Sequence, residues 1–316
     1  MILVADFGGT TIKLGLARDQ QIIARRHLPA VADAPFADRL AAVASAWEAL
    51  LPLHGATLAD CTGVGLALPF LPDPQGQRVQ GDFGKYPGAG AIDFCAWSQD
   101  RLGLPLVLEN DLRMALLGEC ADGVAQGRTE VLMLAFGTGI GCAVLSGGRL
   151  LRGANNRAAT LLGHSSIAWD GPPARCGNVG CAEDLASTAT LAQLARAHPA
   201  YGGSQLAGAS KIDFETVFAL AAENDLCAQA LLQQSLRAWA VLVQNAVLAY
   251  DPEIVVLGGG VLRAHAIILP AIRAHLRRHL PGPPLDIPLV TSALGDDAAL
   301  LGCAVLARQL SASALK

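Results

Sequence analysis

The stretch ILVADFGGTTIKLGLA, residues 2–17, joins two apolar runs through a polar segment with two glycines. Short apolar runs rich in Ile, Leu and Val are typical of buried strands, and a glycine-containing segment between two of them favours a tight turn. A further apolar run follows at residues 22–24. The sequence therefore predicts that the chain opens with a hairpin of strands around the Gly-Gly-Thr segment.

A similar opening recurs in the middle of the chain. The stretch MLAFG at residues 133–137 matches VADFG at residues 4–8, and both turn through Thr and Gly before a second apolar run begins. An internal repeat of this kind suggests two related lobes, each opening with a glycine-turned hairpin. Any two buried hairpins share some of this pattern, however, and the few matched positions leave both interpretations open.

Apolar periodicity predicts that strands and helices alternate along the rest of the chain. Alternation of this kind is typical of an α/β architecture. Strands are expected at residues 64–71, 105–108, 253–257 and 287–291, and helices at residues 36–53, 92–102, 112–124, 185–198, 214–224, 227–250 and 298–310.

The composition argues against several classes of protein. The chain has 316 residues, 52% of them hydrophobic, and a net charge of −4 without a basic stripe, which argues against a nucleic-acid partner. The uncharged stretch at residues 131–148 contains five glycines, which argues against a membrane-spanning helix. The opening residues lack the basic segment of a secretory signal, and the eight cysteines are scattered. We therefore expect a cytoplasmic protein that is not built on disulfides.

Three glycine turns, each directly after an apolar run, are candidates for phosphate binding. Glycine lets the main chain approach a ligand closely and point several N–H groups into one concavity. One such turn is usually only a turn, whereas three at strand ends favour a nucleotide site. The chain does not contain the P-loop pattern. It does not contain G-x-G-x-x-G either, because Cys142 stands where the third glycine would be. The candidate residues are Gly8, Gly9, Thr10, Thr11, Gly137, Thr138, Gly139, Gly258, Gly259 and Gly260.

Two charged residues accompany the first glycine turn. Asp6 precedes it, and a carboxylate in this place is suited to hold Mg²⁺ beside bound phosphates, directly or through water. The alternative role for Asp6 is to cap the turn through side-chain hydrogen bonds. Lys13 follows the turn and is long enough to reach a phosphate oxygen, although a solvated strand lysine is the more common case.

A third candidate, Asp111, follows the apolar run at residues 105–108. Ligand sites of α/β folds lie at the carboxyl ends of strands. Phosphoryl transfer to an alcohol needs a base that accepts the hydroxyl proton, and an aspartate within hydrogen-bond reach does this. From these residues alone, an N-cap for the helix expected from residue 112 is an equally good interpretation.

Short motifs follow one another along nearly the whole chain: DFGGT at 6–10, END at 109–111, GTGIG at 137–141, GH at 163–164, CGNVGCAE at 176–183, DPE at 251–253, GGG at 258–260 and GDDA at 295–298. In this order they resemble the ROK family (repressors, open reading frames and kinases) of the hexokinase–actin superfamily. The resemblance covers residues 2 to about 308, and the ordered set is far more specific than any single motif.

The resemblance implies an α/β fold with two actin-like (ribonuclease H-like) lobes and ATP in the cleft between them. The expected lobes are residues 1–111 with 299–316, and residues 112–298. The implied activity is that of an ATP-dependent sugar kinase, similar to glucokinases and N-acetylhexosamine kinases. Members of the family often form dimers, so the resemblance also implies a homodimer.

The resemblance also assigns roles to individual residues. Asp111 would be the catalytic base, and Asn110 would bind the sugar. His164 and Glu183 would also contact sugar hydroxyls. ATP and Mg²⁺ would be held by Asp6, Lys13 and the three glycine turns.

The chain departs from the family pattern in three places. Leu161 replaces the glutamate of the usual Glu-x-Gly-His motif, whose carboxylate accepts hydrogen bonds from sugar hydroxyls in relatives that resemble this chain. Thr11 stands where a lysine is common, although Lys13 matches a variant of the motif. Ala174 replaces the first cysteine of the usual zinc loop. The phosphate side is therefore nearly intact, whereas the sugar side is altered.

The zinc loop retains three potential ligands, His164, Cys176 and Cys181. A structural zinc site normally has four. Either a water or another side chain completes the site, or the loop folds without metal. If zinc binds, we expect weaker binding than in a four-ligand site.

The family contains both sugar kinases and DNA-binding repressors. The repressors carry a winged-helix domain before the first glycine motif, and here that motif begins at residue 6, so we expect a kinase that acts on a small-molecule sugar. The alternative is a catalytically weak regulatory protein that binds a sugar or a nucleotide. The presence of Asp6, Asp111 and all three glycine turns favours the enzyme.

Overall fold

The structure, a computed structural model, describes residues 1–81, 85–282 and 286–313. The chain divides into two compact units. The first comprises Met1–Gly127, Arg152–Ala158 and Ala293–Lys316, and the second comprises Arg128–Leu151 and Ala159–Ser292. Among the described residues, none of the helices combines the length and the apolar character that crossing a membrane requires.

The first unit is built on a five-stranded sheet with the order β3-β2-β1-β4-β5. β1 pairs antiparallel with β2, which pairs antiparallel with β3, whereas β1, β4 and β5 run parallel. The carboxyl ends of the three parallel strands therefore meet at one edge of the sheet. The strands are β1 (Ile2–Phe7), β2 (Thr11–Arg18), β3 (Gln21–Pro29), β4 (Gly63–Leu68) and β5 (Leu106–Asn110).

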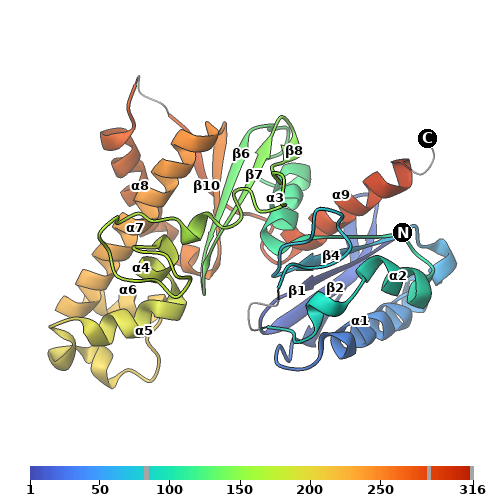
Figure 1. Cartoon of the computed structure of the whole chain (residues 1–316), viewed down its shortest axis with the longest axis horizontal. Coiled ribbons are helices and arrows are strands. Elements are labelled where there is room, and N and C mark those ends of the chain that lie inside the picture. Colours follow the sequence, from blue (N-terminus) through green and yellow to red (C-terminus); the bar gives the residue numbers. More distant parts are fainter. Residues whose placement is uncertain (82–84, 283–285, 314–316) are drawn as a thin grey trace. The chain divides into compact units, whose positions relative to one another are not determined.

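Helices cover both faces of this sheet (Figure 1). α1 (Phe36–Leu50) and α2 (Phe94–Leu102) pack on the face to which Phe7 contributes. α3 (Asp111–Asp122) and α9 (Asp297–Ser313) pack on the opposite face, against Ile2 and Val4. Alternation of buried side chains along β1 thus serves two separate cores, as expected for a sheet covered on both faces.

The main chains of α3 and α9 approach each other very closely. A Cβ atom on Gly302 would lie 1.8 Å from the carbonyl oxygen of Met114, and one on Gly118 would lie 2.0 Å from that of Ala298. Only glycine leaves room for this crossing. The expected lobes, 1–111 with 299–316 and 112–298, separated these two helices, whereas the compact units keep them together. As functional lobes, the expected limits stay a prediction.

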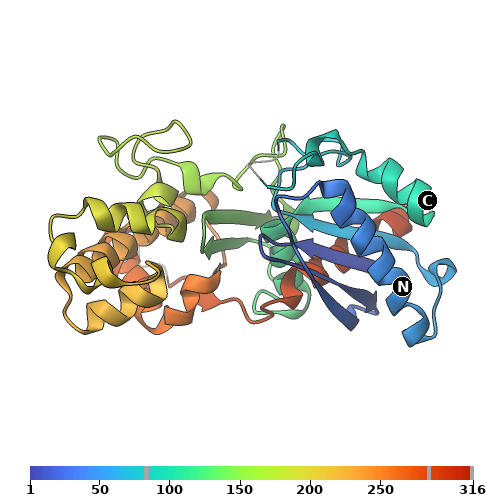
Figure 2. The same ribbon diagram turned by 90° about the horizontal axis from the view of Figure 1, so that it is seen from below.

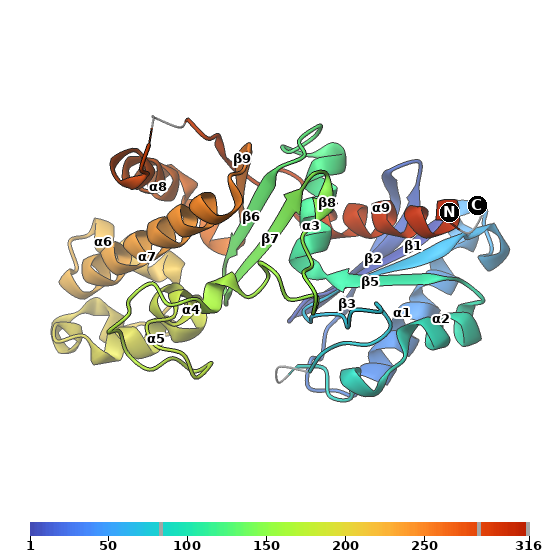
Figure 3. The same cartoon turned by 45° about the horizontal axis from the view of Figure 1, so that its top comes forward.

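The second unit repeats the topology of the first. Its sheet has the order β10-β9-β6-β7-β8. β6 pairs antiparallel with β7, which pairs antiparallel with β8, whereas β6, β9 and β10 run parallel. Figure 3 shows β6 and β9 in this sheet. The repeat predicted from residues 4–8 and 133–137 therefore falls at equivalent places, the ends of β1 and β6. These strands are β6 (Val131–Phe136), β7 (Ile140–Ser146), β8 (Arg149–Leu150), β9 (Ile254–Gly258) and β10 (Leu289–Thr291).

The helices of the second unit form one continuous core with its sheet. Figure 2 shows them, coloured from yellow to orange, gathered beside the green strands. Trp239 of the long helix α7 stacks on Phe136 at the end of β6, with ring centroids 5.3 Å apart. These helices are α4 (Ala182–Ala186), α5 (Thr188–Ala197), α6 (Phe214–Ala222), α7 (Leu226–Tyr250) and α8 (His265–His279).

The α/β fold class and the two actin-like lobes predicted from the sequence are confirmed. One helix expected at residues 185–198 is instead two, because Ser187 adopts an extended conformation between α4 and α5. The N–H of Thr188 then donates to the carbonyl of Gly137, 3.0 Å away. The break thus anchors the second glycine turn to the start of α5.

Candidate active site

Asp6 and Lys13 lie together at the carboxyl end of β1. They face each other across the β1–β2 pair, and Lys13 Nζ lies 3.7 Å from Asp6 Oδ2. The same nitrogen lies 2.7 Å from Oδ1 of Asp296, just before α9. Lys13 is therefore not the solvated strand lysine that the sequence left open, because it bridges two carboxylates.

The electrostatics of this cluster raise the pKa of Asp6. Burial raises the pKa of Asp6 to about 7, and the negative charge of Asp111 adds to this effect, while Lys13 opposes it. Burial alone would lower the pKa of Lys13, but its interactions with Asp296 and Asp6 raise it. A buried carboxylate that is short of positive charge is suited to a divalent cation, which is consistent with the Mg²⁺ role considered for Asp6.

Asp111 is the first residue of α3, and Asn110 is its N-cap. Oδ1 of Asn110 accepts hydrogen bonds from the N–H groups of Leu112 (3.1 Å) and Arg113 (3.3 Å). The capping role that the sequence left open for Asp111 is therefore filled by its neighbour. Asp111 Oδ1 accepts the Leu112 N–H as well, at 2.8 Å.

The side chain of Asn110 also orients Asp111. Its Nδ2 donates to Asp111 Oδ1 at 2.9 Å and to the carbonyl of Phe70 at 3.4 Å. Burial raises the pKa of the half-buried Asp111, against the Leu112 N–H, the charge of Lys85 and the Asn110 hydrogen bond, which lower it. The sequence did not identify Lys85 as part of this site.

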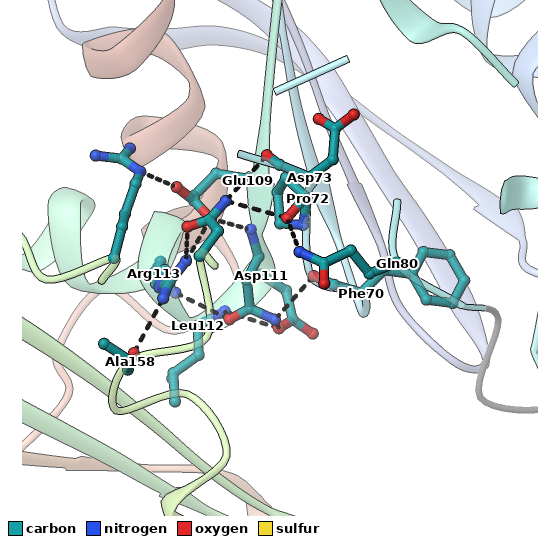
Figure 4. Close-up of polar contacts among 12 residues, drawn as sticks. Phe70, Pro72, Asp73, Gln80, Glu109, Asp111, Leu112, Arg113 and Ala158 are labelled. Atoms are coloured by element: carbon teal, nitrogen blue, oxygen red, sulfur yellow. Dashed lines mark hydrogen bonds and ion pairs between the residues drawn. The ribbon is translucent and has the colours of Figure 1, made fainter. Parts of the chain in front are cut away.

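A buried network that includes Glu109 and Arg113 lies next to Asp111 (Figure 4). Glu109 is 1% exposed and pairs with Arg113, also 1% exposed, at 3.2 Å. Its other oxygen accepts from Arg152 Nε at 2.8 Å. The sequence motif includes Glu109 but neither arginine. The four-residue spacing of Glu109 and Arg113 is a signal for their pair, whereas Arg152 is too distant in the sequence to be linked to Glu109.

The first glycine turn is held by main-chain bonds. The N–H of Gly8 donates to the carbonyl of Thr11 (3.1 Å), and the N–H of Ala30 donates to that of Thr10 (3.1 Å). The hydroxyl of the buried Tyr86 donates to the carbonyl of Gly8 at 2.5 Å. The turn next to Asp6 is thus a fixed feature of the first unit.

In the second unit, two glycine turns lie at the same edge of the sheet. Gly137 and Thr138 follow β6, and Gly258 ends the neighbouring parallel strand β9. Gly259 has φ +89°, and a Cβ there would lie 2.2 Å from the carbonyl oxygen of Phe136. No other residue fits, so the turn needs glycine for its conformation and for its closeness to β6.

These two turns open onto a pocket of about 480 Å³. Gly137, Thr138 and Gly260 contribute to one part of it. Its volume is in the range of roughly 300–1,000 Å³ that is typical of small-molecule sites. The remaining lining is partly apolar and partly charged, and the sequence did not predict it: Phe214, Phe218, Val261 and Ala264, with Lys211, Asp213, Glu215, Arg263 and Thr188.

Glu183 lies at the start of α4 and is tied to the second glycine turn. Its Oε2 accepts the N–H of Ile140 at 2.8 Å and would lie 2.5 Å from a Cβ on Gly139. Oε1 lies 3.6 Å from Arg175 Nη2. The Oε2 atom of Glu183 therefore stabilises the second glycine turn, and the side chain keeps an exposed fraction of 18%.

His164, Cys176 and Cys181 come together in the second unit, as the zinc loop predicts. Their potential ligand atoms all lie within 4.8 Å of one another, and His164 Nδ1 lies 3.9 Å from Cys181 Sγ. Cys176 is exposed and Cys181 is buried. The donor set suits zinc, which prefers sulfur and imidazole nitrogen. Leu161, just before the 3₁₀-helix Leu162–His164, is 38% exposed.

The pKa of Asp6 gives a stability test. Its value of about 7 in the folded protein, against 3.8 when unperturbed, means that Asp6 favours the fold while it is protonated. That contribution is lost as the pH rises through 7. Wild type should therefore lose stability relative to Asp6→Asn as the pH rises. The difference between their free energies of unfolding, variant minus wild type, should increase by about 2 kcal/mol between pH 5 and pH 8, at about 1.4 kcal/mol per pKa unit. Urea unfolding without nucleotide or Mg²⁺ measures it, and a pH-independent difference would contradict the assignment.

Comparison with known proteins gives a consistent result. The ROK family model matches residues 2–310. The N-acetylmannosamine kinase of Shigella flexneri is 31% identical, over 97% of this chain and 98% of that protein. The ROK hexokinase of Thermus thermophilus has a TM-score of 0.81 at 30% identity and 99% coverage of both chains. The ROK glucokinase of Streptomyces griseus, solved with glucose and AMPPNP, has a TM-score of 0.74 at 27% identity, over 98% of this chain and 99% of that one. The chain belongs to the ROK family.

Proposed function

We propose that this protein transfers a phosphoryl group from ATP to a hydroxyl of a hexose or hexose derivative. The observation that carries the proposal is the geometry of Asp111. Its carboxylate is half-buried at the carboxyl end of β5, is oriented by Asn110, and shares the Leu112 N–H with Asn110, which is the N-cap of α3. The names of the relatives, kinases of hexoses and of an N-acetylated hexosamine, support the same reaction.

Asp111 acts as the general base. As the sugar oxygen bonds to the γ-phosphorus, the bond to the β-phosphate oxygen breaks, and the hydroxyl proton passes to the carboxylate of Asp111. ADP leaves with the electron pair of the broken bond. Burial raises the pKa of Asp111 and so brings its basicity closer to the working pH, which favours proton transfer.

The nucleotide binds through the glycine turns. In the second unit, Gly137–Gly139 and Gly258–Gly260 offer main-chain N–H groups to phosphate, and the adjoining apolar wall with Phe214 suits a base and ribose. In the first unit, Gly8–Thr11 and Lys13 contact phosphate. Asp6 holds Mg²⁺, which supplies charge neutralisation at the phosphates when it is bound.

The sugar contacts are Asn110, His164 and Glu183. Nδ2 of Asn110 lies beside the base, so a hydroxyl bound there would be in reach of Asp111. The side chain of Glu183 is 18% exposed, and its Oε2 accepts the Ile140 N–H. Leu161 offers no acceptor, so the preferred sugar presents an apolar edge there, such as a deoxy carbon or a methyl group, or ordinary hexoses bind weakly.

The proposal extends to the oligomeric state, the location and the partners of the protein. We propose a homodimer in the cytoplasm, where ATP is supplied, with a small-molecule sugar as the substrate. The net charge of −4 and the lack of a basic stripe favour neither nucleic acid nor anionic membranes as partners. A sugar- or nucleotide-binding regulator remains the alternative, and a coupled ADP-release assay across a sugar panel separates the two. Turnover on no sugar would favour the regulator.

The clearest prediction concerns the base. Asp111→Asn should fold normally, because its amide oxygen can accept the Leu112 N–H and Asn110 still caps α3. Its kcat should fall by about 10²-fold or more, the usual contribution of a general base. The ADP-release assay measures this, with circular dichroism as the control for folding. Near-normal turnover in this variant would show that Asp111 is not the base.

Zinc gives a second prediction. His164, Cys176 and Cys181 form a three-ligand site that loses its metal to a chelator, since a structural site normally has four ligands. Elemental analysis before and after dialysis against EDTA measures the content, and Ala174→Cys, which restores the usual fourth ligand, should retain zinc. Stoichiometric zinc that survives dialysis in wild type would contradict the weak site, and no uptake of added zinc would contradict binding altogether.

A third prediction concerns sugar specificity. A hydroxyl that faces Leu161 lacks a charged acceptor, which costs about 1.5–3 kcal/mol. That loss corresponds to roughly 10- to 150-fold in affinity. We expect Leu161→Glu to raise kcat/KM for glucose or mannose relative to their deoxy analogues and N-acetylhexosamines. A micromolar KM for glucose in wild type, with no gain on any sugar in the variant, would remove Leu161 from specificity.

A further inference from the structure

Arg113 is a buried cation next to the proposed base. It lies on α3, two residues after Asp111, and is 1% exposed. A buried guanidinium is costly unless its donors are paired. Arg113 donates from Nη1 to Glu109 Oε1 (3.2 Å) and Asn156 Oδ1 (2.7 Å), and from Nη2 to the carbonyl of Ala158 (3.0 Å). Its partners thus come from two segments that are distant in the sequence.

Glu109 extends the network to the main chain at the base. Its Oε1 accepts the N–H of Asn110 at 2.9 Å as well as the guanidinium, and its Oε2 accepts from Arg152. The carboxylate of Glu109 therefore holds the main chain of Asn110, the last residue of β5. Because Asn110 carries the cap and the hydrogen bond to Asp111, a chain of contacts leads from Glu109 through Asn110 to Asp111.

The segment at residues 152–158 supplies the other side of the network. Asn156, with φ +55°, donates from Nδ2 to the carbonyls of Pro72 (3.2 Å) and Asp73 (3.4 Å). Gln80 donates to the carbonyls of Pro72 and Asn155 at 2.8 and 3.0 Å. Three segments of the first unit are thus joined around Arg113 (Figure 4).

We propose that Arg113 and Glu109 are positioning residues for phosphoryl transfer. Their buried ion pair holds Asn110, and through Asn110 it holds the carboxylate of Asp111 in place. The proposal rests on the proposed function, in which Asp111 is the base. Stability alone does not account for the pair, because a buried ion pair is often no more stable than apolar side chains of similar volume.

The test is Arg113→Lys, which keeps the positive charge but loses the fork that reaches Glu109, Asn156 and Ala158 together. We expect kcat to fall on the order of 10²-fold, the effect of a displacement of about 1 Å at a reacting group. The KM for ATP should stay unchanged. Arg101→Lys is the control, because Arg101 pairs with Glu48 at the surface through both of its terminal nitrogens. It should leave kcat unchanged.

Titration of Asp111 provides a readout that does not depend on turnover. The groups that act on its pKa include Lys85, the Leu112 N–H and the Asn110 side chain, all of which lower it. If Arg113→Lys loosens Asn110, the last of these is lost, and the pKa of Asp111 measured by ¹³C NMR should rise above the wild-type value. The acid limb of kcat/KM should move to higher pH in parallel.

The outcomes separate the inference from the function it rests on. If wild type phosphorylates no sugar, the proposed function fails, while the NMR titration still decides whether Arg113 positions Asp111. A loss of stability with unchanged kcat and unchanged Asp111 titration would make the pair merely structural and overturn the inference.

If Arg113→Lys does not fold, Asn156→Gly and Arg152→Gln keep the buried pair and remove one neighbour each. Glycine also tolerates the positive φ at residue 156. Both should show the same changes at smaller size, and normal kcat and titration in both would equally overturn the inference.

Discussion

The start of helix α3 is the constraint on which the proposed chemistry depends. The first N–H groups of a helix have no partner within it and carry partial positive charge. Here three consecutive side chains supply acceptors: Glu109 takes the N–H of Asn110, Asn110 takes those of Leu112 and Arg113, and Asp111 shares that of Leu112. Asp111 is thereby held at the positive end of a helix while it is partly buried. The two effects act on its pKa in opposite directions, and burial is the stronger.

The repeated topology explains why each unit has a glycine turn at one edge of its sheet. In both sheets a central strand has a hairpin partner on one side and a parallel strand on the other. Each hairpin needs a turn at the carboxyl end of the central strand, next to the end of its parallel neighbour. At that edge the N–H groups of Gly8 and Gly137 bond within their own turns, to the carbonyls of Thr11 and Gly139, and so fix the shape of each turn. The same sheet order therefore places Gly8 beside Asp6 in one unit and Gly137 beside Gly258 in the other.

Much of this could be predicted from local sequence. The two hairpins and the glycine turns depend on neighbours within one strand pair, so periodicity and turn residues predict them, whereas the contact of Lys13 with Asp6 and Asp296 appears only in the structure. Arg113 was missed, because its partner Asn156 is 43 residues away and only the folded chain joins them. The apolar wall with Phe214 was missed for the same reason. The break at Ser187 was missed because its cause, the bond from Thr188 to Gly137, is equally remote.

The loop that carries Cys176 and Cys181 is held by hydrogen bonds that do not need a metal ligand at position 174. Ala174 replaces a ligand, yet its N–H still donates to the carbonyl of Asn178 at 2.8 Å, and its own carbonyl accepts the N–H of Gly177. Asn178 Nδ2 in turn donates to the carbonyl of His164 at 2.8 Å. These bonds close the loop within the protein, whereas a zinc finger obtains much of its folding free energy from the metal. The hydrogen bonds of Ala174 and Asn178 do not involve a ligand at position 174, and the bond from Asn178 holds the main chain of His164.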